Sequence, residues 1–349
     1  MSGTQIKKIE ENRKIQVTGG STFILSLPKK WVQKNQIKKG DSVFVREEEN
    51  GSLSIDTLGD GKLEKKEETL IRILPTDNTS SILRKTVSTY LIGYTKIRIL
   101  TNPPHKLSPK LRNELKNFVR QFLVGTEILT DTSLELALQV LLDYRELSMQ
   151  NVLKRMAIIT SSMHKDAMLA LEKMDKQIAK SVIATDSEVD RFSFYMIRQT
   201  KLAISNRQTI KAIGLKNERD CLGYRLITKS IERTADHAAK IAEYVSNFKH
   251  KPERLIIDKI KNLSNFAVSM FDKSIIALFE RNYDLADKVS DSLTEFARLE
   301  KDLLNKSKPN ESADLSNIRL LLESVIRTAE YASDIAEVVL NLNVESILS

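Results

Sequence analysis

The start of the chain has the short hydrophobic periods of β-strands, broken by glycine-containing turns. Four segments are strand-like: 13–17, 22–27, 42–46 and 53–56. Gly19-Gly20 and Asn50-Gly51 are typical of hairpin turns. Pro28 predicts the start of a short helix over 29–34, which Asn35 is expected to end in a left-handed conformation. The front of the chain is therefore predicted to be a small β domain.

A polar, charged linker over 58–68 precedes a block in which strand and helix patterns alternate. Strands are predicted at 70–74, 96–100, 126–129 and 134–142, and helices at 80–92 and 108–123. Ser108-Pro109 is a helix N-cap followed by proline at the first helical position. This block has no phosphate-binding loop, so we expect a small α/β domain with a scaffold or dimerisation role.

The rest of the chain has helical periodicity and repeats its own sequence. Glycine does not occur after Gly223, and 110–251 contain no proline. Met163 aligns with Met270, 107 residues later, and 233–245 is identical to 327–339 at eight of 13 positions. Each copy is predicted to form a three-helix bundle. The predicted helices are 147–183, 187–213 and 219–248 in the first copy, and 253–281, 284–305 and 313–342 in the second.

Positive charge is concentrated at the N-terminus. The net charge is +9, and the first 46 residues hold ten basic and only three acidic side chains. Such a patch permits a DNA partner, although a solvated basic face is the alternative. The residues expected against DNA phosphates are Lys8, Arg13, Lys14, Lys29 and Lys30, with base contacts unassigned.

The β domain is too small to stand alone. A unit of about 45 residues rarely buries a sufficient core without a metal or disulfides, and the chain has a single cysteine, Cys221. Pairing with a second copy of the chain is the remaining way for this domain to bury enough apolar surface. We therefore expect an intertwined homodimer.

Composition excludes several classes of protein. The four histidines form no His-x-x-x-His pair, which excludes a zinc enzyme of the His-Glu-x-x-His type. No nucleophile elbow, Walker loop or dinucleotide fingerprint occurs, so the chain is predicted not to be an enzyme. It has neither a transmembrane stretch nor the apolar core of a signal peptide, and we expect a cytoplasmic location.

Acidic pairs in the helical half are the candidate metal ligands. Asp186 with Asp190, and Glu232 with Asp236, are four residues apart and so share a helix face. If the pairs meet, four carboxylates could hold Fe, Zn, Mn or Mg as a divalent or trivalent ion. The alternative is a set of intrahelical ion pairs of Asp236 with Arg233 and Lys240.

The second copy repeats this pattern only in part. Isoleucine occupies position 326, which matches Glu232, and Glu330 matches Asp236. Glu330 and Asp334 form a shifted acidic pair, which is the possible second metal site.

Two segments resemble known families. Residues 26–45, with Leu-Pro, a short helix and Gly-Asp before a hydrophobic strand, resemble the AbrB/SpoVT/MazE swapped-hairpin DNA-binding domain. They depart from it at Asn35-Gln36-Ile37, where that family often has Leu-Gly-Ile. Residues 232–243, Glu-Arg-Thr-Ala-Asp-His-Ala-Ala-Lys-Ile-Ala-Glu, resemble PhoU, as does the acidic run 186–191. Together they resemble phosphate-uptake regulators of the archaeal type.

The resemblance implies a six-helix fold with carboxylate-bound metal and negative control of phosphate transport. We expect a multidomain α+β chain, with an all-α PhoU-like half of tandem bundles. The expected domains are the β domain 1–57, the α/β domain 68–145, and the bundles 147–248 and 252–342.

The expected function is a phosphate-responsive transcriptional regulator that binds DNA as a dimer. The alternative is a protein that binds a phosphate ABC transporter ATPase without binding DNA. A phosphoester-hydrolysing enzyme that uses the first-copy carboxylates is the third class considered.

Overall fold

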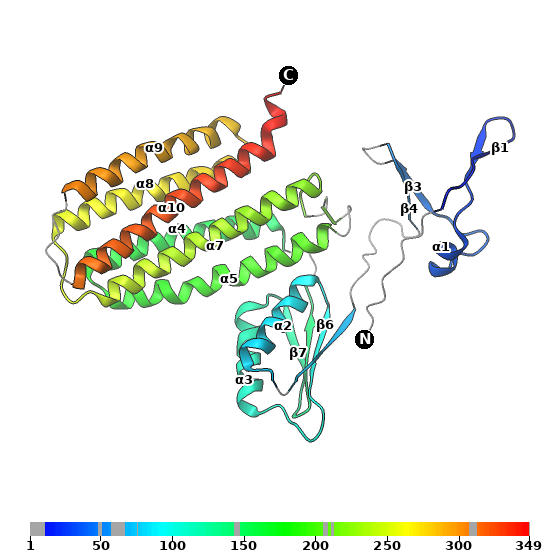
Figure 1. Cartoon of the computed structure of the whole chain (residues 1–349), viewed down its shortest axis with the longest axis horizontal. Coiled ribbons are helices and arrows are strands. Elements are labelled where there is room, and N and C mark those ends of the chain that lie inside the picture. Colours follow the sequence, from blue (N-terminus) through cyan, green and yellow to red (C-terminus); the bar gives the residue numbers. More distant parts are fainter. Residues whose placement is uncertain are drawn as a thin grey trace. The chain divides into compact units, whose positions relative to one another are not determined.

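The chain forms two compact units, Met1–Glu64 and Lys65–Ser349 (Figure 1). The computed structural model describes residues 11–47, 51–56, 67–74, 76–142, 147–204, 209–210, 213–306 and 313–348, without the side chains of 56, 302–306 and 313–315. Lys8 and most of the predicted linker lie outside these ranges.

The N-terminal unit consists of two hairpins and one short helix. Its elements are β1 (Gln16–Thr18), β2 (Thr22–Ile24), α1 (Lys29–Lys34), β3 (Phe44–Glu47) and β4 (Leu53–Asp56). β1 pairs with β2, and β3 pairs with β4, as two separate antiparallel sheets. Gly19 and Gly20 both have positive φ, at 61° and 83°, which is why a tight β1–β2 turn can form there.

Helix α1 has the predicted bounds, but the prediction of its end was wrong. Asn35 has φ −91°, and the left-handed residue is Gln36, with φ 54°. The Gln36 N–H donates to the Gln33 carbonyl, and the Ile37 N–H donates to the Val32 carbonyl. This is a Schellman motif, in which the left-handed residue is the first one beyond the cap.

The second unit begins with a two-layer α/β domain. Its elements are β5 (Glu68–Arg72), α2 (Thr79–Ile92), β6 (Lys96–Leu100), α3 (Pro109–Phe122), β7 (Thr126–Asp131) and β8 (Glu135–Val140). The sheet order is β5-β6-β8-β7, with β5 and β6 parallel and the other pairs antiparallel. Ser108 caps α3 as predicted, because its side chain accepts from the Leu111 N–H. The core lies between the sheet and the two helices.

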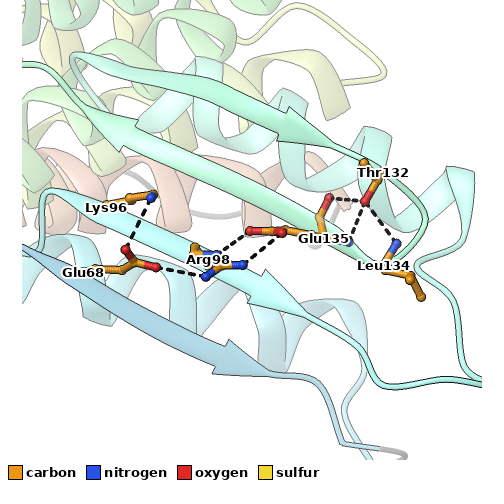
Figure 2. Close-up of polar contacts among 6 residues, drawn as sticks. All are labelled: Glu68, Lys96, Arg98, Thr132, Leu134 and Glu135. Atoms are coloured by element: carbon orange, nitrogen blue, oxygen red, sulfur yellow. Dashed lines mark hydrogen bonds and ion pairs between the residues drawn. The ribbon is translucent and has the colours of Figure 1, made fainter.

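The opposite sheet face carries a ladder of ion pairs across three strands (Figure 2). Arg98 on β6 is paired with Glu68 on β5 at 3.2 Å and with Glu135 on β8. Lys96 is also paired with Glu68, at 3.3 Å. These hydrogen bonds hold the pKa of Glu68 and of Glu135 below the usual range of a carboxyl group.

Six long helices form the rest of the second unit. They are α4 (Met149–Lys173), α5 (Lys176–Ile204), α7 (Glu218–Asn247), α8 (Arg254–Glu280), α9 (Tyr283–Lys306) and α10 (Ala313–Asn343), followed by the 3-10 turn η1 (Val344–Ser346). α4, α5 and α7 form one bundle and α8, α9 and α10 another; contacts of α7 with α10 and of α4 with α8 join them into one core (Figure 1). Within the described ranges, no helix combines the length and apolar character that a membrane span needs.

The first predicted helix break was wrong. A helix over 147–183 was expected, but α4 ends at Lys173 and Met174 takes the left-handed conformation. Asp175 then begins α5, because its side chain accepts hydrogen bonds from the Gln177 and Ile178 N–H groups. The acidic run 186–191 therefore lies in the middle of α5 rather than at its start.

A buried arginine on α5 attaches the α/β domain to the bundles. Arg198 is 4% exposed, and its guanidinium donates to the carbonyls of Tyr90 and Gly93 at the end of α2. Gly93, at φ 109°, is the left-handed cap of α2, and a Cβ atom there would lie 2.5 Å from Leu202 on α5. Among the described residues Arg198 has no carboxylate partner, and its positive charge lies at the negative end of the α2 dipole.

Arg198→Met is expected to destabilise the second unit by about 3 kcal/mol. Two buried carbonyls lose a charged donor, and such a loss costs roughly 1.5–3 kcal/mol for each bond. Thermal unfolding and amide exchange at the end of α2 measure the effect. Arg298→Met, at an exposed position on α9, is the control. An unchanged midpoint in Arg198→Met would contradict this account.

A buried histidine lies where the two bundles meet. His164 on α4 is 1% exposed, and its Nε2 lies 2.9 Å from the Thr234 carbonyl of α7 and 3.3 Å from Thr328 Oγ1 of α10. Burial is the main cause that lowers the pKa of His164 to about 4; the contact with the Thr234 carbonyl opposes the shift, and nearby His237 adds a smaller lowering. The imidazole is therefore held in its neutral form.

Acid should weaken the bundle junction through His164. A histidine with a lowered folded pKa destabilises the fold as pH falls from the unfolded value of about 6.5 to about 4, by roughly 1.4 kcal/mol per pH unit. His164→Phe copies the second bundle, where Phe271 occupies the matching position. Chemical unfolding between pH 7 and 4.5 is expected to show a shallower loss of stability in the variant, with the contribution of His237 remaining. Equal slopes for the two proteins would refute the prediction.

Candidate metal centre and nucleic-acid interface

Helices α5 and α7 bring the two predicted acidic pairs together. Asp186 and Asp190 lie on α5, and Glu232 and Asp236 lie on the neighbouring α7 (Figure 1). One carboxylate oxygen from each of Asp190, Glu232 and Asp236 lies within 4.8 Å of the other two. Asp186 lies outside this group of three. Of the neighbouring carboxylates, Asp236 raises the pKa of Asp186 most strongly by electrostatic repulsion.

The four carboxylates repel one another in a half-buried site. Burial, and after it Asp236, raises the pKa of Asp186 to about 7. Burial, and after it Glu232, raises the pKa of Asp190 to about 6. The pKa of Asp236 is also raised, first by burial and then by Glu232. Burial and mutual repulsion therefore outweigh the nearby positive charge of Lys229, which acts to lower the pKa of Asp190 and Asp236.

Lys229 is a basic partner of the acidic cluster that the sequence analysis did not identify. Lys229 lies three residues before Glu232 and forms an ion pair with it. That spacing on a helix was the signal that could have found it. Within the described part of the chain, Asp236 makes no ion pair with Arg233 or Lys240, and the Arg233 guanidinium lies over the Tyr331 ring instead. Arg233 and Lys240 still attract the Asp236 carboxylate, but burial and Glu232 outweigh them and raise its pKa.

The site fits a hard or borderline cation. Carboxylate oxygens are the donors that Mg and Mn prefer, and Fe and Zn also accept them. A cation would also remove the repulsion that raises these pKa values.

The second bundle has a different arrangement. Glu330 forms an ion pair with Arg327 at 2.7 Å. Burial, and after it Glu337, raises the pKa of Asp334. Among the described residues, only Asp190, Glu232 and Asp236 form a group of three possible ligands. The geometry therefore favours an ion in the first bundle alone.

The basic residues of the N-terminal unit lie at its surface. Lys29 and Lys30 open α1, Arg13 and Lys14 precede β1, and all four are exposed. Arg13 forms an ion pair with Glu11, a partner that the sequence analysis had not assigned. Lys8 lies outside the described residues.

The same unit exposes apolar side chains that a stable domain would bury. None of its described residues is buried. Phe23 is 74% exposed, and several other apolar side chains are also exposed: Ile15, Val17, Ile24, Leu25, Phe44, Val45 and Leu53. Such a concentration of apolar surface is typical of an interaction site.

The fold and the carboxylate site define a class of protein: a duplicated three-helix bundle with an acidic site, joined to a small basic β unit. Residues 153–245 and 260–339 match the PhoU domain family, and residues 16–62 match "Antidote-toxin recognition MazE, bacterial antitoxin". The chain therefore belongs to the PhoU family and carries a MazE-type domain at its N-terminus, as the sequence predicted.

Individual relatives are similar over the helical half. A phosphate-specific transport system accessory protein PhoU homolog from Clostridium acetobutylicum is 29% identical over 171 residues, which are 49% of this chain and 77% of that protein. The PhoU structure from Pseudomonas aeruginosa has 19% identity and a TM-score of 0.48, and covers 57% of this chain and 96% of its own. The phosphate transport system regulatory protein PhoU from Streptococcus pneumoniae has 17% identity and a TM-score of 0.47, with 58% and 96% covered.

Proposed function

We propose that this chain is a phosphate-responsive transcriptional regulator. It binds DNA as a homodimer through the N-terminal unit, and its helical half negatively controls phosphate uptake. The observation that carries the proposal is the pairing of a basic MazE-type unit, none of whose described residues is buried, with a PhoU domain in one chain. The unit's apolar surface supports the homodimer, since a second copy would bury it.

The metal site is the proposed sensor element. Asp190, Glu232 and Asp236 would hold a divalent or trivalent ion, with Asp186 beside them. The ion would supply positive charge that links α5 to α7. Because Arg198 on α5 also holds the end of α2, a change at the carboxylates has a direct path to the α/β domain.

A gel-shift titration against fragments upstream of phosphate-transport genes tests the proposal. Wild-type protein should bind selectively, with an affinity that falls steeply as salt rises. Lys29→Glu/Lys30→Glu should abolish selective binding, whereas Lys288→Glu/Lys301→Glu, the same charge change at exposed positions on α9, should not. Binding no tighter than to random DNA would reject the proposal.

One specific observation favours a second candidate function. The Clostridium acetobutylicum relative is named as an accessory protein of a phosphate-specific transport system. On that basis the chain would bind the transporter's ATPase and use the N-terminal unit only to dimerise. Retention of the purified ATPase by the full chain, together with no selective DNA binding, would favour this function over the first.

A further inference from the structure

A surface groove runs between α4 and α5, on the first bundle. Its volume is about 550 Å³. The apolar part of its lining is Ile158, Ile159, Met163, Leu169, Ile178 and Val182. Asp166 and Glu188 add carboxylates to the lining. The acidic pairs of the metal site contribute no side chain to it.

The groove exposes apolar surface that the fold does not require. Ile158 is 70% exposed, although isoleucine on a helix of a folded domain is usually turned inward. The second bundle has different side chains at the matching positions. At the 107-residue offset, Ile158 matches Asn265, which is also exposed but polar, and Ile159 matches Phe266. The Phe266 ring packs against Phe296 at 6.1 Å between centroids.

The charge at the groove also differs between the two bundles. Asp166 is exposed, and in the described part of the chain its carboxylate accepts one long hydrogen bond, 3.4 Å from Ser162. Glu188 already has Arg155 at 3.9 Å. The second bundle has Lys273 where the first has Asp166. Since Asp166 makes no ion pair with any described residue, the groove presents a negative charge beside apolar surface. This combination is complementary to a basic, amphipathic ligand.

The length of the groove fits a helix. From Ile158 to Leu169, α4 passes through about three turns, roughly 16 Å. A third helix lying along the α4–α5 groove would contact apolar side chains from both walls, as amphipathic helices do in other grooves.

We propose that this groove binds an amphipathic helix of a partner protein, with apolar side chains along one face and a basic side chain opposite Asp166. The site goes beyond DNA binding and metal binding, since it uses none of the residues assigned to either.

A pair of designed peptides tests the site on the full-length chain. Each is a 16-residue helix with leucines three and four residues apart, and the two differ only in a lysine or a glutamate beside the leucine stripe. Methyl NMR of isoleucine and methionine labels reports the location. We expect the lysine peptide to bind with a Kd of roughly 10–100 μM, to shift the Ile158, Ile159 and Met163 signals, and to bind about tenfold more tightly than the glutamate peptide.

Variants taken from the chain's own second bundle sharpen the test. Asp166→Lys should reverse the preference between the two peptides, and Ile158→Asn should weaken both about tenfold. Both substitutions introduce the residue present at the matching position, so unfolding should be unchanged. Absence of binding at about 1 mM peptide, shifts confined to other methyl groups, or an unchanged preference in Asp166→Lys would overturn the proposal. A variant that changes the sedimentation of the chain alone would also overturn it, since the groove would then be an interface between copies.

Discussion

Phe23→Asp is expected to leave the chain monomeric and to weaken its binding to DNA at least about 100-fold. Burial of a phenylalanine contributes roughly 2–3 kcal/mol, and placing a carboxylate in an apolar interface costs several more. Together they exceed about 4 kcal/mol, which weakens a dimer roughly 1000-fold. A monomer also loses half of the phosphate contacts that a dimer makes. Sedimentation velocity and gel shift measure the two effects.

The control for this substitution is Leu255→Asp on α8. Leu255 is 63% exposed, close to the 74% of Phe23, and receives the same new charge outside the N-terminal unit. It should change neither sedimentation nor DNA affinity. A Phe23→Asp chain that still sediments as a dimer would show that the apolar surface of β1 and β2 is not the dimer interface.

Local turn and cap chemistry explains why much of the fold could be predicted. β6 and α1 both have the predicted bounds. The start of α1 was predicted from Pro28, and the bounds of β6 from its hydrophobic pattern. Gly19-Gly20 forms the predicted turn because both residues need a positive φ. These features depend on residues adjacent in sequence, so a single sequence contains the information.

The missed helix break shows where local rules fail. Met174 and Arg281 end α4 and α8 in the left-handed conformation, at φ 55° and 53°, where glycine would be the usual signal. They are 107 residues apart, which is the offset that aligns Met163 with Met270. The predicted break in the second copy, between 281 and 284, was correct, and transferring it to the first copy at the same offset would have found Met174.

Tertiary contacts account for what the sequence did not reveal. The spacing of the acidic pairs predicted one face on each helix, and the structure brings Asp190, Glu232 and Asp236 together across α5 and α7. The role of Arg198 depends on where α2 ends against α5, and that of His164 on the junction of three helices. No pattern along a single segment encodes either contact.

Asp190→Asn/Asp236→Asn is expected to abolish stabilisation by metal while stabilising the metal-free protein. The change removes two of the carboxylates that repel one another but keeps the side-chain volumes. For wild-type protein, an ion at 100 times its Kd adds about 2.7 kcal/mol of stability, which raises the midpoint of a large unit by roughly 5–10 °C. Thermal unfolding after chelation, with and without added Fe(II), Zn(II), Mn(II) or Mg(II), measures both effects.

Asp287→Asn/Asp291→Asn on α9 is the matched control, since it makes the same charge change at two exposed side chains outside the group of three. It should retain the full metal response. If added metal stabilises the Asp190→Asn/Asp236→Asn variant as much as wild type, the ion binds elsewhere. Because the ion would act across α5 and α7, amide exchange should slow on both helices in wild type and on neither in the double variant. Slowing on one helix alone would show that the ion does not link α5 to α7.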